Sequence, residues 1–200
     1  MILTVVISLA AGLAYRKSFK FSGAVFYVTV ASLIVPSILI TLGIGLMFDR
    51  MDIDASWYTS GMGAHLTWTL PFGLLIMFAI FNRFDKSYEE AARDLGATPW
   101  QVMRFVVIPI ITPSLVGIGL FGFTLSFDEF ARSLLSVGSK NTLPLEIFGM
   151  TTTVTTPTLY ALGTLTTAIS FLIIGISFSA IAVIERRRRR HGSDAGQGMV

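Results

Sequence analysis

The sequence has 200 residues, of which 53% are hydrophobic and 14% are charged, and its mean hydropathy is +0.72. Soluble domains carry about 25% charged residues, so this composition disfavours a water-soluble globular protein. There is no cysteine, which excludes a disulfide framework and thiolate chemistry, and the formal charge of +3 is small. Because the apolar residues are gathered in long blocks, we predict a protein of the lipid bilayer.

Five apolar blocks are predicted to be transmembrane helices. A crossing helix needs about 20 apolar residues, and every block except the first meets that length. The blocks cover residues 2–15, 24–48, 57–81, 110–127 and 158–184. We therefore predict an all-α, polytopic transmembrane domain over residues 1–185, followed by a basic tail over 186–200.

Prolines interrupt several of these blocks. Pro36 and Pro71 lie inside the second and third, and Pro109 and Pro113 lie where the fourth begins. Proline removes a backbone hydrogen bond and kinks a helix. Broken helices are common near transport pathways, but proline is also widely tolerated in membrane helices, so both interpretations stay open.

The basic residues predict the orientation. Of the 15 Lys and Arg residues, all but Arg50, Arg132 and Lys140 lie on one predicted side. By the positive-inside rule that side is cytoplasmic, and it holds the loop over 82–109 and the tail. The N-terminus is then outside, although no basic residue precedes the first block. We therefore expect a further helix upstream of this chain.

The arginine run at 186–190 directly follows the last apolar block. A basic run can bind nucleic acid. At the end of a span it more often anchors the helix at the cytoplasmic face, where it attracts anionic lipid. We favour the anchor, and no nucleic-acid partner is expected.

The loop over 82–109 is charged and carries helix start and stop signals. Ser87 with Glu90 three residues later is a capping-box pattern, and Gly96 is a suitable residue after a helix end. Thr98 and Gln101 repeat the capping-box spacing, with a proline at the first helical position. We predict two short helices with a sharp turn at 96–97.

The first of these helices is amphipathic. One face carries Tyr88, Ala91, Ala92 and Leu95, and the other carries Glu89, Glu90, Arg93 and Asp94. A helix of about nine residues is marginal alone, so its apolar face needs support. The acidic residues disfavour a lipid surface, which attracts cations. A groove on a soluble cytoplasmic partner is favoured over a lipid-lying or merely structural loop.

The same loop resembles the EAA signature, EAA followed by Gly and later by Ile-x-Leu-Pro. Glu90, Ala91, Ala92 and Gly96 match, and Pro109 matches the closing proline, whereas Val106 and Ile108 depart conservatively. The signature is typical of the inner-membrane permease subunits of binding-protein-dependent ABC importers. The resemblance covers the whole chain, from the second helix of such permeases onward.

The resemblance implies a type I ABC-importer permease fold in a bacterial inner membrane. It implies that the loop docks as a coupling helix on a cytoplasmic ATPase dimer, through Glu90, Ala91, Ala92, Asp94, Leu95, Gly96 and Pro109. The other partners implied are a second permease subunit and an extracytoplasmic solute-binding protein. This chain should not bind nucleotide itself, since it has no P-loop sequence. No cofactor, metal or catalytic residue is expected in it.

Asp128 and Glu129 stand at the predicted outer end of the fourth span. Carboxylates inside a membrane are costly and often mark a pathway. Alternatively, both are hydrated at the interface, with Arg132 as the partner of Asp128 four residues on. The run SFDEF followed by TLPLEIF resembles permeases of spermidine/putrescine importers, and a polyamine path would need carboxylates and aromatic faces.

The aromatic candidates for that path are Trp57, Tyr58 and Trp68. Trp57 and Tyr58 also fit an interfacial belt, and Trp68 also fits simple packing between helices. His65 is more typical of a packed polar residue than of a metal ligand. Besides an ABC permease, an ion-coupled secondary carrier using Asp128 or Glu129 stays open, but a carrier needs no docking loop.

Overall fold

The computed structural model describes residues 1–17, 19–153 and 156–196. Within these residues all regular structure is helical, which confirms the all-α prediction. The elements are α1 Ile2–Tyr15, α2 Ser22–Ala31, α3 Ser37–Arg50, η1 Trp57–Gly61, α4 Met62–Arg83, α5 Ser87–Asp94, α6 Pro99–Val102, η2 Met103–Val107, α7 Ile108–Phe127, α8 Leu143–Thr153 and α9 Pro157–Gly196. The labels η1 and η2 denote π-helical turns.

Three segments are long and apolar enough to cross a membrane within the described part of the chain. They are Trp57–Arg83, Pro99–Phe127 and Pro157–Val183. They confirm the third, fourth and fifth predicted spans. The first predicted block forms α1, which is a shorter apolar helix of 14 residues.

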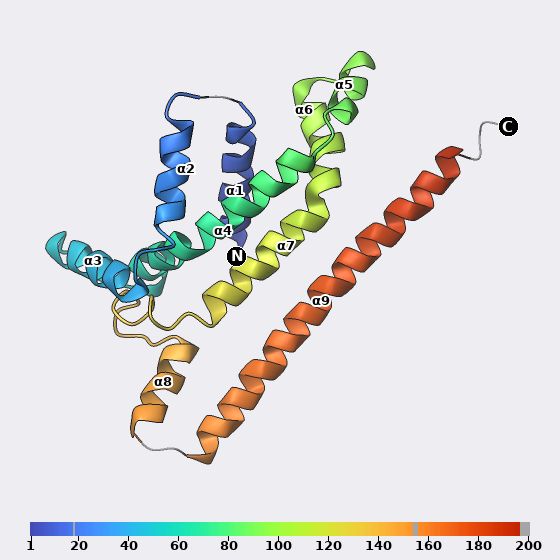
Figure 1. The fold of residues 1–200 in the computed structure, drawn as a ribbon. Coiled ribbons are helices and arrows are strands. Elements are labelled where there is room, and N and C mark those ends of the chain that lie inside the picture. The colour runs from blue at the N-terminus through green and yellow to red at the C-terminus, as the bar shows by residue number, and fades with distance from the viewer. Residues whose placement is uncertain (18, 154–155, 197–200) are drawn as a thin grey trace.

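The second predicted span is wrong as a single helix. Residues 24–48 are divided between α2 and α3, and the break lies just before Pro36. Pro36 stands at the start of α3 with φ −56° and ψ 132°, outside the helical region. Proline has no N–H to continue the helix and disfavours helical geometry in the residue before it. Figure 1 shows α3 turned away from the direction of α2.

The core lies where α1, α4 and α7 pack together (Figure 1). Its fully buried residues are Met77, Val102, Val107, Ile111 and Ile118. Small residues allow the helices to approach closely, as in other membrane bundles. A Cβ placed on Gly73 of α4 would lie 2.1 Å from the Ser8 hydroxyl oxygen of α1.

The chain after α7 reaches α9 through a non-helical segment over 128–142 and through α8, which was not predicted. In Figure 1, α9 is a long helix outside the group of α1, α4 and α7. It contacts α7 and α8. The predicted basic tail begins inside α9, which runs to Gly196, and residues 197–200 lie outside the described part.

The two ends of the molecule carry different elements and a different number of basic residues. Figure 1 places the turn between α1 and α2, the loop helices α5 and α6, and the C-terminal end of α9 toward one end. The segment over 128–142, α3 and α8 lie toward the other end. The predicted cytoplasmic basic residues therefore gather at the end that carries α5 and α6.

Candidate functional site

The loop between α4 and α7 forms two short helices, as predicted. Helix α5 ends before Gly96, whose φ is +83°. The N–H of Gly96 donates to the carbonyl of Arg93 at 2.8 Å, and the N–H of Ala97 donates to the carbonyl of Ala92 at 3.0 Å. This pair of bonds is the Schellman motif, which needs a left-handed residue. The predicted turn at 96–97 is confirmed.

The second loop helix begins as its sequence signals predict. The hydroxyl of Thr98 accepts from the N–H of Gln101 at 3.4 Å, and Oε1 of Gln101 accepts from the N–H of Thr98 at 2.8 Å. Pro99 occupies the first turn. However, this helix does not end before the span. It continues through η2 into α7, so one helical segment runs over Pro99–Phe127.

The predicted capping box at Ser87 and Glu90 is wrong. Lys86 precedes α5 and provides no side-chain cap. Instead, Oδ1 of Asp85 accepts from the N–H of Ser87 at 2.9 Å, so Ser87 lies inside the helix. Aspartate commonly bonds the backbone two residues on, and here it takes the role expected of Ser87. Hydrogen bonding to Ser87 lowers the pKa of the Asp85 carboxyl.

Most of the apolar face of α5 is exposed, as a helix that docks on a partner requires, and the docking itself stays a prediction. Of its predicted apolar face only Ala92 packs against the core, whereas Tyr88 is 56% and Leu95 90% exposed. The buried residue is Glu89, which is 7% exposed. Glu89 forms ion pairs with Arg16 at the end of α1 and with Arg93 in α5. The partner at Arg16 was not foreseen, and no local pattern indicates a contact between residues so distant in sequence.

The exposed surface of the cytoplasmic loop, on α5 and the start of α6, is called here its outer face. It combines exposed apolar side chains with two exposed acids. Its members are Tyr88, Glu90, Ala91, Asp94, Leu95, Gly96 and Trp100. Pro109 is not part of it, because it lies in the first turn of α7, directly after η2.

At the opposite end of the molecule, α7 ends at Phe127 and is followed by Asp128 and Glu129. This confirms that the acidic pair lies at the end of the span. Asp128 is exposed and Glu129 is half-buried. Oε1 of Glu129 accepts from the backbone N–H of Arg132 at 3.0 Å.

The ion pair between Asp128 and Arg132, which belonged to one of the two alternatives for the acidic pair, is not formed. Arg132 is fully buried, and its Nη1 donates to the Thr67 hydroxyl at 2.7 Å. Its guanidinium lies over the Trp68 ring, 4.9 Å from the centroid. The Nε and Nη2 groups have no hydrogen-bond partner among the described residues. The segment over 128–142 thus turns its arginine inward onto α4 and leaves Asp128 outside.

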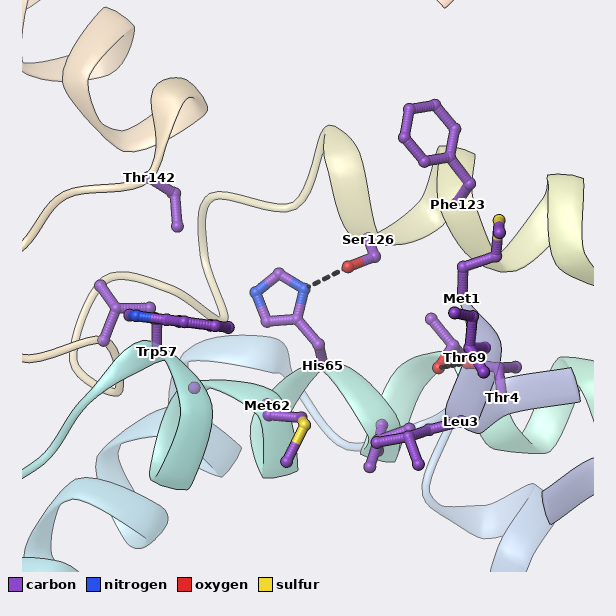
Figure 2. Close-up of a pocket in the computed structure, with 14 residues that line it drawn as sticks. Met1, Leu3, Thr4, Trp57, Met62, His65, Thr69, Phe123, Ser126 and Thr142 are labelled. Carbon is purple, nitrogen blue, oxygen red and sulfur yellow. Dashed lines mark hydrogen bonds between the residues drawn. The ribbon is translucent and has the colours of Figure 1, made fainter. Parts of the chain in front are cut away.

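A pocket of about 520 Å³ lies beside this segment, between α1, α4 and α7. Figure 2 shows His65 of α4 pointing into it, between Trp57 and Ser126. The two ring nitrogens of His65 lie 2.9 Å from the Ser126 hydroxyl and 3.0 Å from the Ser133 hydroxyl. His65 is therefore a packed polar residue, as predicted. The pocket lining is largely apolar and includes neither Asp128 nor Glu129.

The aromatic candidates occupy different places. Trp57 lines the pocket and is 62% exposed. Tyr58 is 60% exposed and packs edge-on against Trp57, with centroids 5.5 Å apart. Trp68 packs edge-on against Phe72 of the same helix at 5.1 Å, beneath Arg132 of the segment over 128–142, and is not in the pocket lining.

The chain is similar in sequence to known transport proteins. Residues 4–191 match the family described as the binding-protein-dependent transport system inner membrane component. The spermidine/putrescine transport system permease protein PotC of Haemophilus influenzae is 31% identical over 175 residues, covering 87% of this chain and 68% of that protein. The putrescine transport system permease protein PotI of Escherichia coli is 29% identical over 186 residues, covering 90% and 66%. The chain spans about two thirds of these relatives' length.

The fold is also similar to that of a solved structure. A chain of the MetNI methionine ABC transporter, in inward-facing conformations, superposes with a TM-score of 0.71 at 18% identity. The match covers 92% of this chain and 88% of the other, and it shows a shared permease fold. Family and fold favour a permease over an ion-coupled carrier. The chain belongs to the family of inner-membrane components of binding-protein-dependent transport systems, and it is a multi-pass membrane permease.

Proposed function

We propose that this chain, paired with a second permease subunit, forms the translocation path of an ATP-driven polyamine importer in a bacterial inner membrane. A separate cytoplasmic ATPase drives it through the outer face of the loop. An extracytoplasmic binding protein delivers the solute. The chain itself carries out no chemical reaction in this proposal.

The exposed outer face is the observation that carries the proposal. Leu95 is 90% and Trp100 66% exposed, at the basic end of the molecule. Large apolar side chains grouped with Glu90 and Asp94 suit a groove on a protein partner better than anionic lipid. Gly96 and Ala91 leave room for the partner, because a Cβ on Gly96 would meet nothing within 4 Å.

The substrate class is supported by the relatives and by charge. Two relatives are permeases for putrescine or spermidine by name. Asp128 is exposed and Glu129 half-exposed at the end of α7, where they can meet a solute entering from outside. Both acids, with Trp57, Tyr58 and Trp68, remain the residues we propose for the path. Carboxylates attract the ammonium groups of a polyamine directly.

The test uses the permease pair reconstituted in liposomes with its ATPase and binding protein. We expect ATP-dependent uptake of labelled spermidine or putrescine. Leu95→Asp should reduce both uptake and the amount of ATPase that co-purifies by about tenfold, since an anchor residue contributes about 1.4 kcal/mol or more. Leu95→Met is the matched control and should behave like the parent.

The outcomes separate the two halves of the proposal. Normal ATPase binding by Leu95→Asp contradicts docking through the outer face. Uptake of neither polyamine by an assembly whose ATPase responds to another solute contradicts the substrate class, and the chain is then a permease for that other solute.

A further inference from the structure

Glu89 connects the loop to a part of the chain far away in sequence. Its Oε1 accepts a hydrogen bond from Nη2 of Arg16, the residue that ends α1. Its Oε2 lies 3.3 Å from Nη2 of Arg93. Both ion pairs found among the described residues thus share this one carboxylate. Only the pair with Arg16 joins two different helices.

The pair with Arg16 is shielded from water. The side chain of Glu89 is 9% and that of Arg16 19% exposed, whereas that of Arg93 is 58% exposed. Ion pairs screened from water interact more strongly than those at the surface, and breaking one leaves a charge without its partner. The contact with Arg16 therefore holds α5 more firmly than the exposed pair within α5.

Two aromatic rings fix the position of the Arg16 guanidinium. Its Cζ lies 5.0 Å from the centroid of Phe81 and 5.4 Å from that of Phe84. Phe81 belongs to the last turn of α4, and Phe84 lies in the link to α5. Arginine binds such ring faces through cation–π attraction. The long Arg16 side chain is thus preorganised toward Glu89 by the segment that leads into α5.

From its middle to its C-terminal turn, α1 packs closely against α4. Its residues Ser8 and Gly12 lie against Gly73 and Met77 of α4, at distances that leave no room for a Cβ on either glycine. A displacement of α5 can reach the bundle along the continuous helix Pro99–Phe127. The Arg16–Glu89 contact provides a second, separate route, from α5 into α1.

We infer that Arg16 and Glu89 are positioning residues that make α1 move together with α5, so that ATPase motion reaches the bundle by both α1 and α7. The inference rests on the proposed docking of the loop on an ATPase. A contact that only stabilised the fold would change the amount of folded protein, but not the ratio of solute transported to ATP hydrolysed.

That ratio is the measurement, made on the full transporter in liposomes. Arg16→Gln and Glu89→Gln should still assemble with the ATPase, yet transport about fivefold or more less solute per ATP, the lower range of typical coupling between sites. Arg93→Gln removes the exposed partner of the same carboxylate and should stay within about twofold of the parent, as expected for a surface pair.

A covalent link gives a second readout. The chain has no cysteine, so Arg16→Cys with Glu89→Cys introduces the only thiols in this chain. A short bifunctional thiol reagent should raise the ratio of this variant back toward the parent, because the two helices then move as one. If crosslinking stops transport instead, the contact must open during the cycle and the inference is wrong.

The inference also fails if both single glutamine variants keep the parental ratio. Failure of the proposed function looks different, because the parent would then retain no ATPase on purification. Parental ATPase binding with unchanged ratios in the glutamine variants would leave the docking proposal standing and remove only the role of Arg16 and Glu89.

Discussion

At Gly96 the backbone takes φ +83°, a conformation that costs other L-residues about 1–2 kcal/mol. A side chain there would find open space within this chain, since a Cβ would meet nothing within 4 Å. Glycine is therefore required first for the turn that ends α5. The angle between α5 and the helix that starts after Thr98 is set by this turn.

This leads to a prediction at the residue scale. Gly96→Val should weaken ATPase binding and uptake strongly, because a β-branched residue is poorly tolerated at positive φ. Gly96→Asn should retain more of both, because asparagine tolerates the left-handed region. Co-purification and uptake would be measured at matched expression. Equal loss in both variants would point to crowding against the partner, and not to backbone strain.

At the scale of elements, α1 and α4 are joined by close packing of small residues. A hydrogen bond of 2.9 Å links the hydroxyls of Thr4 and Thr69, and the Ser8 side chain fills the space beside Gly73. Such contacts replace the hydrophobic driving force, which is weak between helices in lipid. The position of α1 on α4 thus depends on a few residues with small side chains.

We therefore expect Gly73→Ala to destabilise the permease by about 1–3 kcal/mol, the usual cost of overpacking. The new Cβ would lie 2.1 Å from the Ser8 hydroxyl oxygen. Gly63→Ala on the same helix meets nothing within 4 Å and is the matched control. Adding Ser8→Gly should recover much of the loss. Thermal unfolding in detergent is measured for the parent and the three variants; an unchanged midpoint for Gly73→Ala would argue against close α1–α4 packing.

The sequence predicts elements better than it predicts how they face one another. Three spans are confirmed because length and apolar content are local properties, and the caps at Gly96 and Thr98 are confirmed because they involve only near neighbours. The burial of Glu89 is different. It accompanies the contact of Glu89 with Arg16, a residue 73 positions away, and no local pattern indicates that contact.

The same reasoning explains the undivided second span and the position of Arg132. Block 24–48 is apolar throughout, so hydropathy alone could not divide it, although Pro36 marks the point. Arg132 was expected to reach Asp128 by helical spacing. The chain after Phe127 is not helical, however, so Arg132 turns onto Thr67 and Trp68 of α4.

On the scale of the whole molecule, one helical segment joins the two proposed functional regions. Pro99–Phe127 has 29 residues, or about 43 Å of helix, and runs from the outer face of the loop to the acidic pair. The π-turn and the prolines at 109 and 113 lie near its loop end. Motion of the loop can thus reach Asp128 and Glu129 along one continuous helical segment.

The buried positive charge of Arg132 repels a cationic solute at this end of the molecule. Glu129 is the nearby acid whose negative charge can compensate that repulsion. Glu129 bonds the backbone N–H of Arg132 and not its side chain, so its second oxygen can accept from a passing ammonium group. Asp128 is more exposed. A charge pair at 4 Å is worth about 1 kcal/mol in water and about 4 kcal/mol at an effective dielectric of 20.

We therefore expect Glu129→Gln to reduce polyamine uptake by tenfold or more, since each 1.4 kcal/mol corresponds to about tenfold. Asp128→Asn should have a smaller effect, because its surroundings are wetter. Both substitutions keep shape and remove one charge. Asp49→Asn, at an exposed acid in the last turn of α3, is the control and should transport like the parent. Uptake of labelled spermidine would be measured in cells lacking other polyamine importers, and parental uptake by the Asp128→Asn/Glu129→Gln double variant would place both carboxylates outside the path.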